Sequence, residues 1–149
     1  MFVNGEFFNW GHGTVKLNDL TLIDFDEISD WGYEVERKLR YGKGYKPRGF
    51  TTTQYKAEGP SIKLTQEQMN IILEIPEVRQ KGILNVQFTV TVVLDKGNGE
   101  VYEGSLGQCM LNKVSLDGFK QGGDAIMRTL KFFTFGELIE NGVSPFGDA

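Results

Sequence analysis

Very few residue types in this 149-residue chain could support catalysis or metal binding. His12 is its one histidine and Cys109 its one cysteine, so a zinc site would lack ligands. A Ser-His-Asp arrangement would have to use His12, which lies between two glycines near the N-terminus. A single cysteine also allows no intramolecular disulfide, and its strand-like surroundings predict that Cys109 is a small buried residue. The composition therefore predicts a protein without enzymatic activity, bound metal or cofactor.

Two glycine-containing segments resemble ion or phosphate sites but lack the residues that those sites need. Residues 95–106 begin like a calcium-binding loop, yet Glu100 stands where the loop needs its glycine and Leu106 where it needs a bidentate glutamate. Residues 44–49 have the glycine spacing of a phosphate-binding loop, but Phe50 follows where lysine is required. Neither segment supports a prediction of ligand binding.

The most informative stretch runs from residue 31 to residue 64. Trp31, Tyr33, Val35 and Leu39 alternate with charged residues in the period-2 pattern of a half-buried strand, and Arg37 is the one exception on the apolar face. A glycine-rich basic loop over residues 41–52 leads into a second alternating strand that continues through residue 64. The pattern predicts a long antiparallel hairpin. Because its tip has no catalytic residues, we expect it to contact another copy or another chain.

The net charge of −4 at pH 7 conceals an uneven distribution along the chain. Residues 1–30 carry six acids and one lysine, whereas residues 31–56 carry seven bases and two acids. The last sixteen residues carry three acids and no base. Two interpretations stay open: a solvated surface with local charge bias, or a self-complementary surface on which the basic patch of one copy docks against the acidic patch of the next.

One helix is clearly indicated. Thr65 and Gln68 have the spacing of a capping box, in which the threonine hydroxyl accepts the N–H of Gln68 and the Gln68 side chain reaches back. Apolar residues follow at helical spacing until Pro76, which ends or kinks the helix because it cannot donate a backbone hydrogen bond. A further turn is expected to stop at Gly82.

The remaining segments predict short β-strands. Residues 14–29 indicate a hairpin that turns at Asn18-Asp19. Alternation predicts further strands over residues 84–94, 100–106, 108–116 and 125–135. Together these elements predict a mainly β (α+β) fold, an antiparallel two-sheet sandwich or barrel with one flanking α-helix and a long β-hairpin loop. The length predicts a single domain over residues 1–149.

The sequence contains no apolar run near the roughly 20 residues that span a bilayer. Residues 1–10 lack the basic start and the small-residue cleavage site of a signal peptide. We therefore expect a chain that is made in the cytoplasm and does not insert into a membrane.

Several blocks, in order, resemble the tail tube proteins of tailed bacteriophages, most closely those of contractile tails. The blocks are residues 41–47, 54–58 and 61–64, the capped helix, and then residues 106–115, 121–126 and 141–145. The resemblance covers residues 13–147 approximately and consists of glycine, proline and amphipathic-strand patterns rather than one unique signature. The inner-tube protein of bacterial type VI secretion shares this architecture, and the sequence separates the two poorly.

The resemblance implies a structural virion protein that assembles into six-fold rings, stacked as the inner tube of a tail. The tube would pass DNA, without binding it specifically, and a tape-measure protein, with sheath, baseplate and tail terminator proteins as partners. The hairpin tip would reach a neighbouring ring, and an N-terminal arm (residues 1–12) and a C-terminal arm (residues 136–149) would lie against adjacent subunits. The residues expected at these interfaces are Phe2, Phe7, Phe8, Trp10, Tyr41, Lys43, Tyr45, Lys46, Arg48, Phe50, Pro145 and Phe146.

Two polar strand faces are candidates to line the bore of such a tube. They are formed by Glu34 and Glu36, and by Asn85, Gln87, Thr89 and Thr91. An ordinary solvated face explains each set equally well, and the sequence pI of 5.1 fits a neutral or acidic bore. Strands with polar outer faces can also join edge to edge between copies and close a barrel.

Two further functions remain possible from the sequence. A nucleic-acid-binding β domain is suggested because residues 37–56 interleave basic residues with Tyr41, Tyr45, Phe50 and Tyr55, although the chain as a whole is acidic. A ligand-binding barrel would need an interior pocket that the sequence does not reveal.

Overall fold

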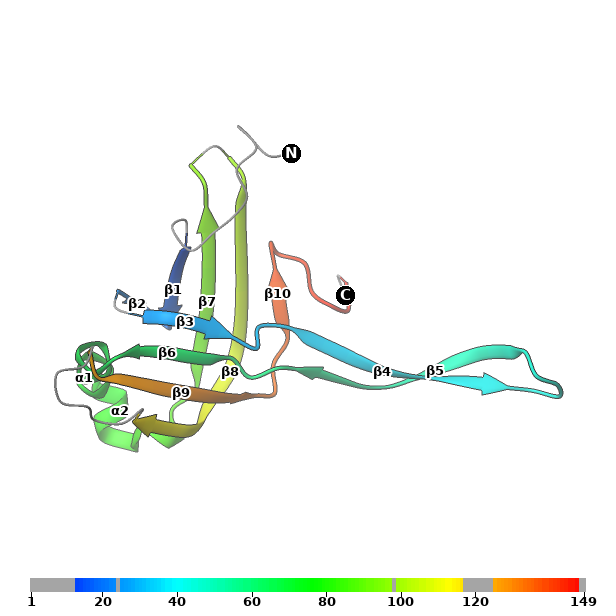
Figure 1. The fold of residues 1–149 in the computed structure, drawn as a ribbon, viewed down its shortest axis with the longest axis horizontal. Helices are drawn as coiled ribbons and strands as arrows, with labels where there is room; N and C mark the ends of the chain where they lie inside the picture. The colour runs from blue at the N-terminus through cyan, green and yellow to red at the C-terminus, as the bar shows by residue number, and fades with distance from the viewer. Residues whose placement is uncertain (1–12, 24, 98, 117–124, 148–149) are drawn as a thin grey trace.

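The computed structural model describes residues 13–23, 25–97, 99–116 and 125–147, and most of them lie in β-strands (Figure 1). The strands are β1 (Gly13–Leu17), β2 (Leu20–Leu22), β3 (Phe25–Ser29), β4 (Tyr33–Tyr41), β5 (Pro47–Ala57), β6 (Ser61–Thr65), β7 (Phe88–Asp95), β8 (Val101–Leu116), β9 (Met127–Thr134) and β10 (Leu138–Glu140). The helices are α1 (Gln66–Leu73), α2 (Pro76–Lys81) and the 3₁₀ turn η3 (Ile83–Asn85).

Eight of these strands form one curled antiparallel sheet in the order β2-β1-β7-β8-β9-β6-β3, with β10 also paired to β8. Strands β1 and β7 run across the direction of β3, β6 and β9, so the sheet has two halves that face each other as a half-barrel (Figure 1). Strands β4 and β5 form a separate two-stranded sheet that projects from this body. The predicted fold class, an antiparallel sandwich or barrel with flanking helix and long hairpin, is confirmed.

Strand β8 belongs to both halves of the sheet. Its first part pairs with β7 and β10, and its second part pairs with β9. The two strands predicted over residues 100–106 and 108–116 are therefore one strand, and that prediction was wrong. The chain turns at Gln108, which has a φ of 56° and lies at the point where the register with β7 shifts, so a bulge bends the strand without ending it.

A glycine permits the matching corner on the neighbouring strand. Gly136 lies between β9 and β10, and a Cβ there would stand 2.6 Å from the carbonyl oxygen of Gly107 in β8. Only a residue without a side chain allows this close approach. Strands β9 and β10 can therefore follow the same edge of β8 around its bend.

The hydrophobic core fills the space between the two sheet halves and is closed by the helices. Phe88 of β7 and Phe132 of β9 meet edge to face, with ring centroids 6.0 Å apart. Cys109 lies in this core with no exposed surface, as predicted, and burial raises its pKa to about 11. The core residues are Val15, Leu17, Leu22, Ala57, Ile62, Leu64, Met69, Ile72, Val78, Val86, Phe88, Val90, Val92, Leu106, Cys109, Leu111, Leu130, Phe132 and Leu138.

The helical segment follows the prediction in its start and its stop. The Thr65 hydroxyl accepts the backbone N–H of Gln68 at 3.3 Å and caps α1. Pro76 is the first residue of α2, and Gly82, with a φ of 84°, ends it. The predicted kink at Pro76 therefore separates two short helices.

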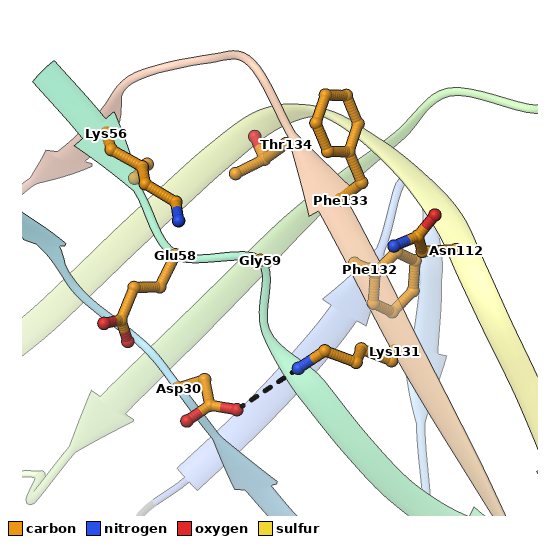
Figure 2. Close-up of a pocket in the computed structure, with 10 residues that line it drawn as sticks. Asp30, Lys56, Glu58, Gly59, Asn112, Lys131, Phe132, Phe133 and Thr134 are labelled. Carbon is orange, nitrogen blue, oxygen red and sulfur yellow. Dashed lines mark ion pairs between the residues drawn. The ribbon is translucent and has the colours of Figure 1, made fainter. Parts of the chain in front are cut away.

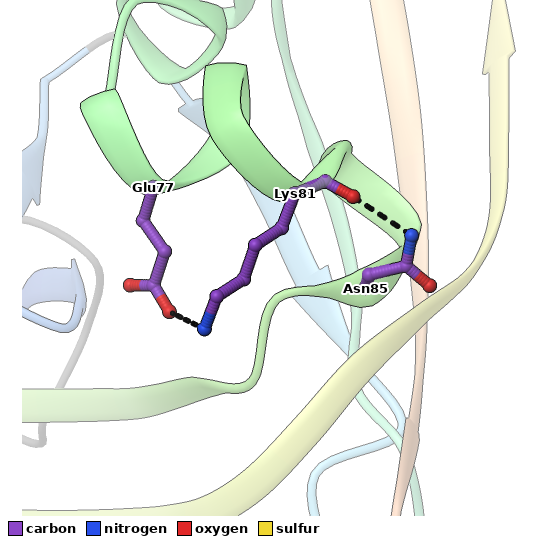
Figure 3. A network of polar contacts seen from close by, with 3 residues as sticks. All are labelled: Glu77, Lys81 and Asn85. Carbon is purple, nitrogen blue, oxygen red and sulfur yellow. Dashed lines mark hydrogen bonds and ion pairs between the residues drawn. The ribbon is translucent and has the colours of Figure 1, made fainter.

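The strand predicted from residue 84 begins only at Phe88. The Asn85 side chain donates a hydrogen bond to the carbonyl oxygen of Lys81 at 2.8 Å, which holds η3 against the end of α2 (Figure 3). Lys81 in turn pairs with Glu77 at 3.3 Å. Asn85 therefore completes a helix end and does not continue the polar face of β7.

The hairpins were predicted with mixed success. The turn at Asn18-Asp19 between β1 and β2 is confirmed, and the Asn18 side chain accepts the backbone N–H of Thr89 at 2.8 Å. The loop predicted over residues 41–52 is shorter, because β4 and β5 extend to Tyr41 and Pro47. Residues 61–65 do not continue that hairpin; they form β6, which pairs with β3 and β9.

Candidate subunit interface

The clearest candidate site is the hairpin of β4 and β5, called here the arm, which extends far from the body (Figure 1). One of its faces carries Leu39 and Phe50, which are direct partners across the two strands and are 59% and 63% exposed. Tyr41 continues this exposed apolar face toward the tip. These exposed apolar side chains on a projecting ribbon make this face a candidate interaction surface, because within the described chain no layer packs over them.

Arg37 lies on the same face as these apolar residues. The pairing register of β4 with β5 shifts between Val35 and Arg37, so a β-bulge lies in the part of the arm nearer the body. The Arg37 guanidinium lies 5.8 Å from the centre of the Phe50 ring, a cation–π arrangement. Arg37, which is the one charged residue on the apolar face of this strand, therefore contacts an aromatic ring.

The rest of the arm is strongly basic and exposed. Five cations, Lys38, Arg40, Lys43, Lys46 and Arg48, are all exposed. Among the described arm residues the one ion pair is Lys38 with Glu36, at 3.6 Å. The tip loop runs from residue 42 to residue 46 and includes Gly44, with a φ of 116°, and the exposed Tyr45. The predicted interface residues at the tip are therefore accessible, and their contact with another copy stays a prediction.

A hydrogen-bond chain fixes the first strand of the arm to the body. The indole Nε1 of Trp31, just before β4, donates to the hydroxyl of Tyr102 in β8 at 2.9 Å, and that hydroxyl donates to the Glu140 carboxylate at 2.6 Å. Burial, and next the hydrogen bond to Glu140, raise the pKa of Tyr102 to about 12. A Cβ at Gly104 would stand 2.6 Å from the Tyr102 hydroxyl, so glycine leaves room for this chain.

The second strand of the arm is fixed by the C-terminal segment. The hydroxyl of Tyr55 in β5 accepts the backbone N–H of Leu138 at 3.1 Å. The Phe146 ring meets the Tyr55 ring edge to face, with centroids 4.9 Å apart. Pro145 and Phe146 line a groove of about 380 Å³ beside the arm, together with Tyr33 and Arg37.

Residues 136–149 were predicted to lie against adjacent subunits, and that stays a prediction. Within the chain, their described part includes β10 and folds onto the base of the arm. Phe146 keeps most of its surface exposed, so a contact of Pro145 and Phe146 with another copy stays a prediction. The N-terminal interface candidates, Phe2, Phe7, Phe8 and Trp10, lie outside the described residues, as does His12.

The six candidates for the bore do not lie on one surface. Glu34 and Glu36 lie on the polar face of the arm, beside Gln54 and Lys56. Thr89 and Thr91 lie on β7, where they alternate with buried residues as predicted. Asn85 caps a helix and Gln87 precedes β7. Whether either set lines a bore stays a prediction.

A groove of about 420 Å³ at the base of the arm was not predicted (Figure 2). Its walls come from the end of β5 and from β8 and β9, and Asp30 and Lys131, which form an ion pair at 3.7 Å, are among the residues that line it. Gly59 also lines it, and a Cβ there would overlap the carbonyl oxygen of Phe132. Its mixed charges match no catalytic arrangement. No local sequence signal could have found it, because its walls are far apart in the chain.

The described ranges hold no cluster of three or more His, Cys, Asp or Glu residues that could bind a metal ion. Within the same ranges, no helix combines the length and apolar character needed to cross a membrane.

No protein-family model matches the sequence, and no curated protein matches it either. Solved structures do match the fold. A chain in the sheath/tube terminator of an extracellular contractile injection system, PVC, in its extended state, has a TM-score of 0.70 and 12% identity, with 93% of this chain and 99% of that chain covered. A chain in the PVC sheath-tube complex has a TM-score of 0.63 and 15% identity, with 94% and 95% covered.

This chain has the fold of contractile-system tube proteins. Hcp1 from Flavobacterium johnsoniae shares the fold more distantly, with a TM-score of 0.51 and 9% identity over 91% of this chain and 98% of Hcp1. The tube-protein fold therefore covers nearly the whole chain and agrees with the resemblance predicted from the sequence.

Proposed function

We propose that this chain is a structural subunit that polymerises into the inner tube of a phage-type contractile tail. The observation that carries the proposal is the arm, whose exposed apolar face and basic tip need a partner outside the described chain. The similarity in fold to chains of a sheath-tube complex and a tube terminator supports the same role. The role is structural and uses no cofactor.

The finer proposal is a stack of six-fold rings in a virion tail. In the described part of the chain, β2 and β3 end the curled sheet and each pairs along one edge only. Pairing of these edges between copies would close the half-barrels into a continuous ring and leave no free edge to aggregate. The arm would then reach the next ring, with sheath, baseplate, tail terminator and tape-measure proteins as further partners.

Assembly of the purified protein tests the proposal directly. Sedimentation and negative-stain microscopy over a range of concentrations and salts are expected to show rings or filaments. Replacing Lys43, Lys46 and Arg48 with serine is expected to leave the melting temperature nearly unchanged, because exposed charges contribute about 0–1 kcal/mol each, and to shorten the filaments. A protein that stays monomeric under every condition would contradict the proposal.

The tube would conduct DNA without gripping it. Each phosphate contact by Lys or Arg adds salt-dependent affinity, which would slow passage. We therefore expect assembled tubes to bind free DNA negligibly at physiological salt. Tight, salt-sensitive binding would instead favour the nucleic-acid-binding alternative, to which the interleaved tyrosines and bases of the arm point.

A tube of the type VI secretion class is the second candidate, and the fold shared with a type six secretion system protein, at a TM-score of 0.53 and 11% identity, favours it. The genes next to this one distinguish the two, because a phage tail requires capsid and tape-measure genes nearby whereas a secretion system requires membrane-complex genes.

A further inference from the structure

One face of the arm carries apolar side chains from its base to its tip. Every second residue of β4 lies on this face, and so do the residues of β5 that pair directly with Val35, Arg37 and Leu39. The face consists of Tyr33, Val35, Arg37, Leu39 and Tyr41 on β4 and of Tyr55, Thr52 and Phe50 on β5. These residues are called the arm strip, in which Arg37 is the one charged residue.

At the base of the arm, the arm strip lines the groove of about 380 Å³ together with the C-terminal segment. Pro145 and Phe146 contribute to this lining, and the Phe146 ring lies 4.9 Å from the Tyr55 ring, centre to centre. Glu34 lines the groove too, although alternation along β4 places its side chain on the opposite face of the arm. Toward the tip, the strip continues beyond the groove as the exposed Leu39 and its partner on β5. The groove and the strip therefore form one apolar surface.

An occupant of this surface needs apolar side chains and no further positive charge, because the charge on the strip is that of Arg37. Residues 1–12 have this composition. Four of these twelve residues are aromatic, compared with 12% of the whole chain, and the segment holds one acid and no lysine or arginine. The aromatic residues are Phe2, Phe7, Phe8 and Trp10, and the acid is Glu6. Its aromatic content and its charge therefore complement the arm strip.

The exposed end of the arm strip lies beyond the reach of the Phe7-Phe8 pair of its own chain. Phe8 lies five positions before the start of β1 in the body, and so within about 18 Å of it. Leu39 lies eight positions beyond Trp31, which is hydrogen-bonded to the body, and this separation corresponds to about 27 Å of extended strand. Because the arm projects away from the body (Figure 1), a Phe7-Phe8 pair that meets Leu39 comes from another copy.

We propose that residues 1–12 of one copy bind along the arm strip of a second copy, with their aromatic side chains in the groove and on the exposed end of the strip. This inference rests on the proposed function, since it names the partner of the arm in the assembly. The segment and the strip are different surfaces of one chain, so the contact is head-to-tail and repeats into rings or filaments.

Disulfide trapping tests the pairing directly. Asn9→Cys, in the segment, and Thr52→Cys, on the strip, leave the aromatic residues of both surfaces in place. When the two full-length variants are mixed and mildly oxidised, we expect a linked dimer in which peptide mass spectrometry finds positions 9 and 52 joined. The native Cys109 is buried and does not compete. The matched control is Thr51→Cys, on the opposite face of the arm, which is expected to give about tenfold less of the linked dimer because its Cβ points away.

Loss of aromatic side chains tests whether the same contact drives assembly. A variant with Phe7→Ser and Phe8→Ser is expected to need about tenfold more protein than the wild type to form rings or filaments. The matched control, Asn4→Ser with Asn9→Ser, keeps every aromatic residue and is expected to assemble like the wild type. Circular dichroism on each variant checks that the fold is intact before the assembly result is scored.

The outcomes separate this inference from the proposed function. If the cross-link forms between copies but the wild type never forms rings or filaments, the contact stands and the tube role is contradicted. If the wild type assembles but Asn9→Cys links to Thr52→Cys no better than to Thr51→Cys, the segment does not bind the arm strip although the tube role stands. Full assembly of the variant without Phe7 and Phe8 would lead to the same conclusion.

A chain that carries both Asn9→Cys and Thr52→Cys distinguishes one copy from two. Disulfides that link two chains support the inference. Disulfides that close within a single chain, so that the oxidised protein stays monomeric on a denaturing gel, would overturn it, because the segment would then cover the arm of its own chain.

Discussion

The hydroxyl of Tyr55 accepts the backbone N–H of Leu138 at 3.1 Å, and these two residues are 83 positions apart in the chain. The bond joins the arm to the start of β10, so a strand of the curled sheet helps to set the direction of the arm. Together with the Trp31–Tyr102–Glu140 hydrogen-bond chain, it attaches both strands of the arm at their base.

Replacing Tyr55 with phenylalanine tests this attachment. The change leaves the Leu138 N–H without its partner while keeping the ring against Phe146, so the free energy of unfolding is expected to fall by about 0.5–1.5 kcal/mol. Urea denaturation measures the change. Tyr33→Phe is the matched control, since its ring lies beside Tyr55 at 6.2 Å and it is expected to have a smaller effect. Equal stability of the two variants would mean that the bond contributes nothing.

The raised pKa of Tyr102 predicts that the folded protein loses stability at high pH. The pKa of Tyr102 is raised from 10.0 to about 12, first by burial and then by its hydrogen bond to Glu140. The unfolded chain therefore releases this proton at lower pH than the folded chain. The stabilising contribution is complete below pH 10 and is lost as pH rises toward 12.

Denaturation between pH 9 and 12 measures this loss, with Tyr102→Phe as the comparison, because phenylalanine cannot titrate. The variant is expected to lose less stability than the wild type over the upper part of this range. Both proteins keep the contribution of Cys109, whose pKa is raised from 9.0 to about 11 by burial. Parallel curves for the two proteins would contradict the role assigned to Tyr102.

Truncation of two neighbouring phenylalanines on β9 is expected to change the stability of the fold by very different amounts. Phe132 is 2% exposed and packs on Phe88, whereas Phe133 is 53% exposed. Phe132→Ala is expected to cost about 3–5 kcal/mol because it leaves a cavity in the core. Phe133→Ala is expected to change the stability of the monomer by about 0.5 kcal/mol or less. Similar losses in thermal denaturation would show that the sheet face of β9 is wrongly assigned.

Alanine substitutions at two glycines are expected to differ in their effect on stability. A Cβ at Gly59 would overlap the carbonyl oxygen of Phe132, whereas nothing lies within 4 Å of a Cβ at Gly49 (Figure 2 shows Gly59 beside Phe132). Gly59→Ala is therefore expected to force the backbone apart and to destabilise the fold by about 1–3 kcal/mol. Gly49→Ala is expected to leave it unchanged. The melting temperatures of the two variants test this expectation. Equal melting temperatures would contradict the close approach at Gly59.

Local signals predicted the parts of the fold that depend on neighbouring residues. The cap at Thr65, the stop at Gly82 and the turn at Asn18 all involve hydrogen bonds or backbone angles within a few positions. The bend of β8 was missed because Gln108 carries a left-handed conformation that is unusual for glutamine, so the residues around it indicated a strand end.

The candidate site was predicted only in part for a related reason. Period-2 alternation over β4 shows that one face is apolar but not what covers that face, and within the described chain Leu39 and Phe50 remain exposed. The attachments at the base of the arm join residues as far apart as Tyr55 and Leu138, and neither partner carries a local signal for the other. The hydrogen bond from the backbone N–H of Ile23 to the Gln68 side chain could not be predicted either, because the sequence indicated Gln68 only as part of a helix cap.

The shared strand β8 has a consequence for how the subunit forms. Strand β8 joins the two halves of the sheet, and each half is completed only by a strand from much earlier in the chain, because β1 pairs with β7 and β6 pairs with β9. Pairings over such sequence separations make folding slow, because chain entropy is lost before the contacts that compensate for it form. We expect one cooperative transition, during which each newly made copy still has its apolar arm face exposed. The rate of folding, relative to the rate at which copies meet, would then decide between ordered assembly and aggregation.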